Sequence, residues 1–140
     1  MKKIIIINGP NLNLLGSREP SVYGTENFEG FYQRLCGDIE AEISYFQSNV
    51  EGELINALQQ LDCEGIVLNA GGYTHTSVAI RDCIAAISIP VVEVHISNIH
   101  AREAFRKESL LSPVCIGSIV GLGLSGYELA LSFFLKKMNL

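Results

Sequence analysis

The chain has 140 residues, of which 48% are hydrophobic and 18% charged, so it can bury a proper core and we expect one domain over residues 1–140. A formal net charge of −5, with only short basic pairs, argues against nucleic acid as a partner. No apolar run reaches the about 20 residues that cross a membrane, and the first residues lack a signal-peptide cleavage pattern. We therefore expect no membrane association and a cytoplasmic location.

Runs of β-branched residues alternate with amphipathic segments along the chain. Strands are predicted at residues 2–7, 44–47, 65–69, 91–96 and 115–120. Helices are predicted at residues 25–43, with Thr25 as the N-cap, and at 51–61, 77–87, 100–106 and 126–138. This alternation predicts an α/β fold with a parallel sheet between helices. Five such units favour the flavodoxin-like three-layer arrangement with strand order 2-1-3-4-5.

A long loop follows the first predicted strand, over residues 8–24, with the sequence N-G-P-N-L-N-L-L-G-S-R-E-P-S-V-Y-G. Its three glycines and two prolines prevent the strand from continuing, and its leucines favour burial over disorder. Ligands of open α/β sheets bind at the carboxyl ends of the strands. We therefore interpret this stretch as an ordered functional loop that carries Asn11, Arg18 and Tyr23.

The loops after the first, third and fourth strands lie side by side in this topology. The third strand ends at Asn69 and leads to His75 through Gly71 and Gly72, which let the backbone approach a ligand closely. The fourth strand contributes polar residues at alternate positions, namely Glu93, His95 and Ser97. We expect these side chains to form one polar site.

Glu93 and His95 are two residues apart on a predicted strand, so both side chains point to the same face. A carboxylate beside an imidazole fixes the tautomer of the ring, which suits a general acid. An exposed polar strand end has the same spacing, and at this point the two interpretations are about equally supported.

Tyr23 is a candidate base because Arg18 lies five residues before it in the same loop. A tyrosine base must ionise near pH 7 although its ordinary pKa is about 10, and an arginine at about 4 Å supplies roughly the free energy that this needs. Spacing alone favours the alternative, in which Tyr23 packs on the first helix and Arg18 is solvated.

Arg102 and Arg106 are spaced i, i+4 in the helix predicted after the fourth strand. Such a pair can hold a carboxylate, with backbone N–H groups of the turn at 97–98 beside it. A surface helix with ion pairs to Glu103 or Glu108 has the same pattern.

Several other patterns indicate no site. Gly121-x-Gly123-x-x-Gly126 precedes a helix, but no strand follows that helix and no acidic residue lies about 20 positions on, so we interpret it as a turn. The three histidines and four cysteines lack metal-ligand spacing, so we expect no metal and interpret the cysteines as buried free thiols. No lysine follows the first or third strand, which argues against Schiff-base chemistry.

These motifs together resemble the type II 3-dehydroquinate dehydratase family along the whole chain. The resemblance rests on the loop at 8–24 and on four further segments: Q-S-N-V-E-G-E-L at 47–54, L-N-A-G-G-Y-T-H-T-S at 68–77, E-V-H-I-S-N at 93–98 and H-A-R-E-A-F-R at 100–106. It implies an enzyme without cofactor or metal that eliminates water from 3-dehydroquinate to give 3-dehydroshikimate. That reaction serves the shikimate pathway of aromatic amino-acid biosynthesis or quinate breakdown.

The resemblance also implies residue roles. Tyr23 would remove the C2 proton beside the ketone, Arg18 would favour its phenolate, and Asn11 would hold a water against the enolate. His95 would protonate the departing C1 hydroxyl while Glu93 holds its ring. The expected substrate-binding residues are Asn69, His75, Ile96, Ser97, Arg106 and, from a neighbouring subunit, Asp82.

Members of that family assemble as trimers, and four trimers form a dodecamer, so the resemblance implies a homo-oligomer. The chain has Leu124 and Val50 where the family often has proline and histidine, and neither position is catalytic.

Two other functions stay open from the residues alone. One is a flavodoxin-like module that binds a small anion or nucleotide, and the joint presence of Arg18, Tyr23 and His95 argues against it. The other is a hydrolase on the same fold, and the missing Gly-x-Ser-x-Gly turn argues against that.

Overall fold

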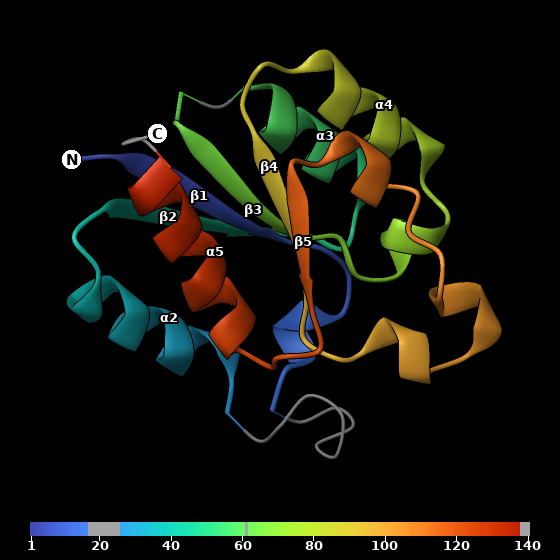
Figure 1. The fold of residues 1–140 in the computed structure, drawn as a ribbon, viewed down its shortest axis with the longest axis horizontal. Helices are drawn as coiled ribbons and strands as arrows, with labels where there is room; N and C mark the ends of the chain where they lie inside the picture. Colours follow the sequence, from blue (N-terminus) through green and yellow to red (C-terminus); the bar gives the residue numbers. More distant parts are fainter. Residues whose placement is uncertain (17–25, 61, 138–140) are drawn as a thin grey trace.

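Five parallel strands form one sheet at the centre of the computed structural model, which describes residues 1–16, 26–60 and 62–137 (Figure 1). The strands are β1 (Lys3–Asn8), β2 (Glu42–Gln47), β3 (Gly65–Asn69), β4 (Val91–His95) and β5 (Gly117–Val120). Their order is β2-β1-β3-β4-β5, and every neighbouring pair is parallel. The α/β class and strand order predicted from the sequence are confirmed.

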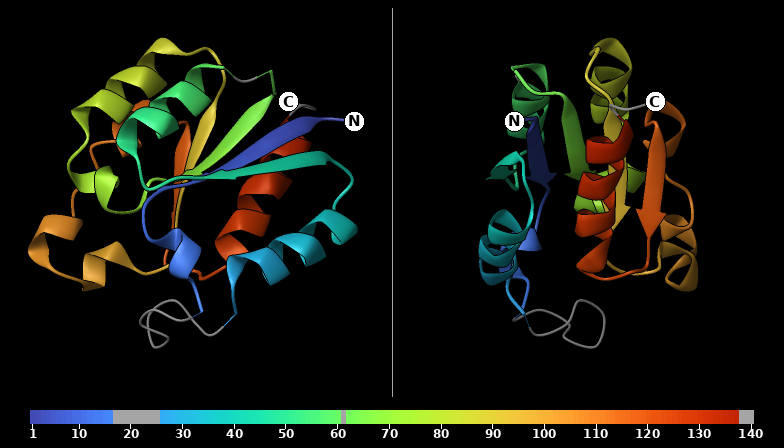
Figure 2. Two further views of the ribbon diagram at one scale, coloured as in Figure 1. Left: turned by 180° about the vertical axis from the view of Figure 1, so that it is seen from behind. Right: turned by 60° about the vertical axis from the view of Figure 1, so that its left-hand side comes forward.

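Helices cover both faces of this sheet (Figure 2). α2 (Phe28–Asp38) and α5 (Ser125–Lys137) share one hydrophobic cluster with the strands. α3 (Glu51–Gln59) and α4 (Val78–Ala86) share a second cluster with them. A parallel sheet needs this cover because both of its faces are apolar. Within the described ranges, no helix is both long and apolar enough to cross a membrane.

The four isoleucines of β1 alternate between these two clusters. Ile4 and Ile6 pack with α2 and α5, whereas Ile5 and Ile7 pack with α3 and α4. Successive side chains of a strand point to opposite faces, so a strand covered on both sides needs an uninterrupted apolar run. The run therefore fixes β1 inside the sheet and directs the loop that follows to its carboxyl edge.

Helix α2 is shorter than the sequence pattern predicts. Asn27 is its N-cap, because the Asn27 side chain accepts a hydrogen bond of 2.9 Å from the N–H of Gly30. The predicted cap, Thr25, lies outside the described residues. The chain is already extended at Ile39, and the N–H of Glu42 donates to the carbonyl of Lys2 at 2.8 Å. The end of the predicted helix therefore belongs to β2, which pairs with β1 from Glu42 onward.

The helix predicted at 100–106 is wrong. Two 3₁₀ turns occupy this stretch, η3 (Ile99–Ala101) and η4 (Ala104–Arg106). Between them Arg102 is extended, with φ −101° and ψ −160°, so Arg102 and Arg106 do not share a helix face. Both side chains line the same pocket, but not because they share a helix face as the i, i+4 spacing predicted.

The four free cysteines differ in exposure. Cys83 is buried, Cys63 and Cys115 are half-buried, and Cys36 is exposed. The prediction of buried thiols is wrong for Cys36, because Leu35 takes the inward position at this turn of α2.

Gly65, the first residue of β3, tests how α5 packs on the sheet. A Cβ at this position would lie 2.7 Å from ring carbons of Phe134, which is buried. We expect Gly65→Ala to lower the free energy of unfolding by about 1–3 kcal/mol, the cost of an overpacked core, measured by urea denaturation.

Gly37→Ala is the matched control for this prediction. A Cβ at Gly37 meets nothing within 4 Å, and alanine is favoured over glycine in a helix by about 1 kcal/mol. Equal effects of the two substitutions would contradict the packing argument.

Candidate active site

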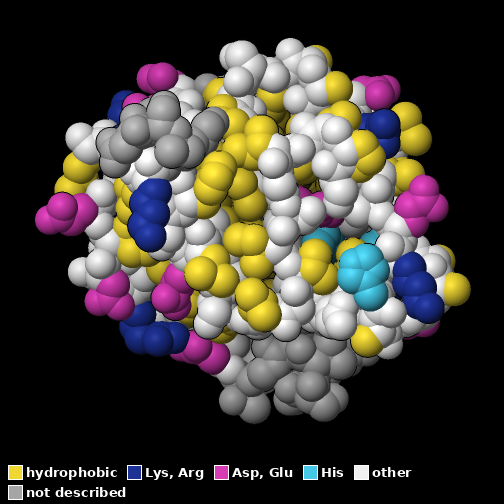
Figure 3. All heavy atoms as spheres, viewed as in Figure 1, with side chains coloured by type: hydrophobic (Ala, Val, Ile, Leu, Met, Phe, Trp, Pro, Cys, Tyr) yellow, Lys and Arg dark blue, Asp and Glu magenta, His cyan; other side chains and the backbone are white. Residues whose placement is uncertain are grey.

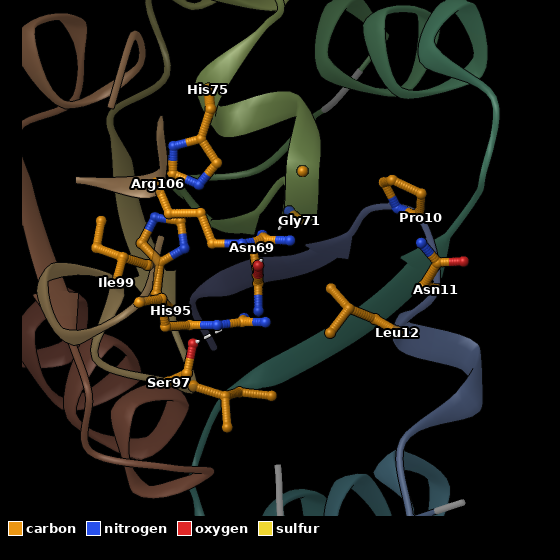
Figure 4. Close-up of a pocket in the computed structure, with 13 residues that line it drawn as sticks. Pro10, Asn11, Leu12, Asn69, Gly71, His75, His95, Ser97, Ile99 and Arg106 are labelled. Carbon is orange, nitrogen blue, oxygen red and sulfur yellow. Dashed lines mark hydrogen bonds between the residues drawn. The ribbon is translucent and has the colours of Figure 1, made fainter. Parts of the chain in front are cut away.

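A pocket lies at the carboxyl edge of the sheet, among the loops that follow β1, β3 and β4 (Figure 4). The N–H of Gly9 donates to the carbonyl of Asn69 at 2.7 Å, and a Cβ on Gly9 would lie 2.5 Å from the carbonyl oxygen of Ala70. Only glycine permits this close approach of the two loops. The lining residues are Pro10, Asn11, Leu12, Asn69, Gly71, Gly72, His75, His95, Ile96, Ser97, Ile99, Arg102 and Arg106.

Asn11 enters the pocket wall in a left-handed conformation, with φ 71° and ψ −6°. Asparagine is one of the few residues besides glycine that adopt this region readily. The N–H of Asn11 donates to Oδ1 of Asn49 at 3.0 Å, just before α3. This bend starts the 3₁₀ turn η1 (Leu12–Leu14), whose first residue, Leu12, is buried. The loop is therefore anchored on both sides of Asn11.

Glu93 and His95 form a buried pair at the end of β4. Their side chains are 1% and 6% exposed, and Nε2 of His95 lies 2.6 Å from Oε2 of Glu93. The exposed strand end considered as an alternative is therefore wrong. An ionised carboxylate only accepts hydrogen bonds, so Nε2 carries the proton in this contact. Nδ1 is then the ring nitrogen left to exchange a proton with a bound molecule.

Two serines complete the surroundings of Glu93. Oγ of Ser109 donates to Oε2 at 2.6 Å, and Oγ of Ser112 donates to Oε1. Burial opposes ionisation of Glu93, but the hydrogen bond and charge of His95 and the two hydroxyls outweigh it and hold the pKa of Glu93 below its ordinary value. The carboxylate is thus kept charged in an interior position.

Asn69 belongs to a second buried network. Its Nδ2 donates to the hydroxyl of Tyr127 at 2.9 Å, and that hydroxyl donates to Oδ1 of Asn8 at 2.8 Å. Oδ1 of Asn69 accepts from the N–H of Gly71 at 3.1 Å. Burial raises the pKa of Tyr127, which keeps it a donor. Among the described residues only one N–H of the Asn69 amide has an acceptor, which leaves the other for a molecule in the pocket.

Two arginines and a second histidine also line the pocket. Nη1 of Arg102 lies 3.4 Å from Oγ of Ser97, and Nε of Arg106 bonds Oε2 of Glu103 at 2.7 Å. His75 bonds the carbonyl of Glu108 through Nδ1 at 2.8 Å. Figure 4 shows His75, His95 and Arg106 on one side of the pocket and Pro10, Asn11 and Leu12 on the other. No acidic residue is among the described lining residues, so the pocket suits an anionic molecule.

Most of the predicted site residues that the structure describes meet in this pocket. The lining includes Asn11, Asn69, His75, His95, Ile96, Ser97 and Arg106. Glu93 lies behind His95 rather than in the lining. Asp82 is exposed on α4 and does not line this chain's pocket. Tyr23 and Arg18 lie outside the described residues.

Sequence reasoning missed Ser109 and Ser112. They are 16 and 19 residues beyond Glu93, in a stretch without periodicity or a known motif, so no local signal pointed to them. In the described part of the chain, no group of three or more His, Cys, Asp or Glu side chains is placed to hold a metal ion.

A buried carboxylate–imidazole pair at the strand ends of a flavodoxin-like sheet is the arrangement of an α/β acid–base enzyme. The model of one such family, Dehydroquinase class II, matches residues 2–135. The chain belongs to this family, as the sequence motifs predicted.

Named relatives agree along nearly the full length. The chain is 54% identical over 144 residues to the 3-dehydroquinate dehydratase of Bacillus licheniformis, covering 99% of each chain. It is 58% identical over 132 residues to the 3-dehydroquinate dehydratase of an Exiguobacterium species, covering 92% of this chain and 91% of the relative. Among solved structures, the type II dehydroquinase of Butyrivibrio crossotus superposes with a TM-score of 0.91 at 47% identity, covering 96% and 97% of the two chains.

The depressed pKa of Glu93 predicts a pH dependence of stability. Its ordinary pKa is 4.5 and its folded pKa is lower, so the ionised carboxylate stabilises the fold above about pH 4.5. That stabilisation is lost as the pH falls from there through the folded pKa. We expect thermal unfolding curves to show a steeper loss of Tm below pH 4.5 in the unaltered chain than in Glu93→Gln.

Glu40→Gln serves as the control for this measurement, because Glu40 is exposed after α2. It should keep the slope of the unaltered chain. Equal slopes of Tm against pH in all three proteins would contradict the prediction, because folding would then not favour the charged form of Glu93.

Proposed function

We propose that the chain is a 3-dehydroquinate dehydratase, which eliminates water from 3-dehydroquinate to give 3-dehydroshikimate in the shikimate pathway. The observation that carries this proposal is the Glu93–His95 pair at the wall of a polar, cationic pocket. The names of the relatives support it, and the proposed cellular location is the cytoplasm.

The proposed reaction needs an acid and a base at different faces of the substrate ring. The C2 proton lies beside a ketone and is weakly acidic, and the C1 hydroxyl leaves as water only when it gains a proton. His95 is the proposed acid, because Glu93 occupies Nε2 and leaves Nδ1 to deliver a proton. This route balances its protons without a metal or cofactor.

The proposed base is Tyr23, which removes the C2 proton, with Arg18 favouring its phenolate. Both assignments rest on the loop motif at 8–24, because the two residues lie outside the described ranges. Asn11 is proposed to hold a water against the enolate oxygen, and its place in the pocket lining supports this role.

The remaining pocket residues are proposed to hold the substrate. Asn69, His75 and Arg106 would bind ring hydroxyls, and the N–H left on the Asn69 amide suits an oxygen lone pair. Backbone N–H at Ile96 and the Ser97 hydroxyl would bind the carboxylate. Asp82 would act at the site of a neighbouring subunit.

This last role requires assembly, and we propose a homododecamer built from four trimers. Hydrophobic side chains gather on the face formed by α5 and β5 (Figure 3). Exposed residues of these elements and their flanks include Ile116, Leu122, Leu129 and Phe133. Apolar surface of this kind is common at interfaces between subunits.

Turnover of 3-dehydroquinate tests the proposed function directly. The conjugated enone product absorbs in the ultraviolet, so rapid absorbance growth is expected, and it should survive a chelator and borohydride treatment. Tyr23→Phe and His95→Gln should each lower kcat by about 10²- to 10⁴-fold, the usual contribution of a general base or acid.

Matched variants control for loss of structure. Tyr32→Phe removes a tyrosine hydroxyl that bonds the carbonyl of Ile43, and His100→Gln changes an exposed imidazole outside the pocket lining. Both should keep near-normal kcat. A folded protein without turnover would overturn the proposal, and full activity of Tyr23→Phe would end the assignment of the base.

The proposed assembly is tested by sedimentation. A dodecamer should sediment at about twelve times the chain mass of 15.3 kDa, and a charge placed in the apolar face, as in Phe133→Glu, should lower that mass. A monomer at micromolar concentration would contradict this prediction.

A further inference from the structure

The stretch from Glu108 to Ser112 supports both histidines of the pocket. The carbonyl of Glu108 bonds Nδ1 of His75 at 2.8 Å. Behind His95, Oγ of Ser109 donates to Oε2 of Glu93 at 2.6 Å, and Oγ of Ser112 donates to Oε1. The same short stretch thus reaches one imidazole directly and the other through a carboxylate.

This stretch is itself firmly held. The N–H of Leu110 donates to the carbonyl of Thr74 at 2.9 Å, and the carbonyl of Leu110 accepts from Nη1 of Arg81 at 2.9 Å. Leu111 is fully buried in the cluster of α3 and α4. The two serines therefore present their hydroxyls from a rigid support.

The hydroxyls constrain Glu93 at both oxygens. Without them the carboxylate would lie buried with His95 as its main partner, and a buried charge with unfilled acceptor sites is costly. With Oε1 held by Ser112 and Oε2 by Ser109, rotation of the carboxylate breaks at least one charge-assisted hydrogen bond. The orientation that meets Nε2 of His95 is thereby fixed.

We propose that Ser109 and Ser112 are positioning residues, which keep Glu93 ionised and aimed at Nε2 of His95 so that Nδ1 faces the substrate as the proton donor. This inference goes beyond the proposed function and rests on it for its catalytic consequence. The positioning itself is a property of the fold and can be observed without turnover.

Ser112 is the cleaner probe of the two. Oγ of Ser109 also accepts from the N–H groups of Leu111 and Ser112, at 3.1 and 3.0 Å, so Ser109→Ala breaks the local turn as well. Ser112 bonds Glu93 through its hydroxyl and Ser109 through its backbone N–H. Ser112→Ala therefore removes the contact with the carboxylate and leaves the turn in place.

Steady-state kinetics separate positioning from binding. We expect Ser112→Ala to lower kcat about 10- to 100-fold, as loss of a supporting partner behind an imidazole does, with KM within about threefold. Ser112→Thr keeps the hydroxyl and should restore most of kcat. Ser132→Ala, on the exposed side of α5, should match the unaltered chain.

The pH profile gives a readout that simple destabilisation would not change. The groups that face Glu93 are His95, the two serines and Cys115. Burial and the charge of Glu93 raise the pKa of Cys115 to about 12. His75 stacks on His95 with ring centres 6.5 Å apart. Loss of one hydroxyl weakens the preference of Glu93 for its charged form, so the acidic limb of kcat should move to higher pH in Ser112→Ala.

Solid-state ¹⁵N spectra test the positioning without catalysis. The chain has three histidines, and the His95 signals are those lost in His95→Gln. The unaltered chain should show Nε2 protonated in both the neutral and the charged ring, with Nδ1 as the nitrogen that gains and loses the proton. Ser112→Ala should show a second neutral tautomer or a shifted Nε2 signal. Ser112→Cys, of similar size but a weak donor, replaces the alanine variant if that protein does not fold.

The two proposals fail in distinguishable ways. An unaltered chain that is folded but inactive removes the proposed function, while the spectra still decide the positioning. Unchanged His95 signals and an unchanged kcat in Ser112→Ala would overturn the inference. Loss of kcat that Ser112→Thr does not restore, with His95 signals unchanged, would also overturn it, because the hydroxyl would then not be what matters.

Discussion

The buried charge of Glu93 is the constraint on which the pocket depends. A carboxylate on an inner strand that is 1% exposed is tolerated only with several donors around it. One donor, His95, comes from the same strand, and the other two come from the far end of the connection between β4 and β5. That connection must therefore return over the strand end instead of forming one regular crossover helix. It also brings Arg102, between its first two 3₁₀ turns, and Arg106, in the second, to the pocket.

A second constraint joins the two ends of the chain. Tyr127 of α5 is fully buried and links Asn8 at the end of β1 to Asn69 at the end of β3. These two asparagines are register partners in the sheet. The helix that closes the fold thus also orients an amide of the pocket wall, so packing of α5 and geometry of the site depend on each other.

The sequence predicted the parts of this structure that depend on local pattern. The third strand was predicted with its observed bounds, Gly65–Asn69, because an apolar run bounded by glycine is a local signal. The convergence of Asn69, His75 and His95 followed from topology, since parallel strands end at one edge.

What the sequence could not predict depends on partners distant in the chain. The helix expected at 100–106 had suitable spacing, but Arg102 is extended and its Nη1 lies 3.4 Å from Oγ of Ser97, just beyond the end of β4. Ser109 and Ser112 gain their role only from Glu93, and no periodicity marks such a contact. The spacing of Glu93 and His95 fitted a catalytic pair and an exposed strand end equally well, and only the packing of distant segments around Glu93 decides between them. Tyr23 and Arg18 stay predictions from a motif.

His95 stands between two electrostatic environments, and this position explains why the carboxylate must be buried. On the pocket side, Arg102 and Arg106 favour an anionic molecule and oppose any further positive charge nearby. A proton donor on this side therefore needs a negative charge beside it that does not line the pocket. A carboxylate that lined the pocket would instead pair with the two arginines and would repel an anionic ligand. Behind the imidazole, Glu93 holds its negative charge next to His95 and outside the pocket lining, and the two serines keep it there.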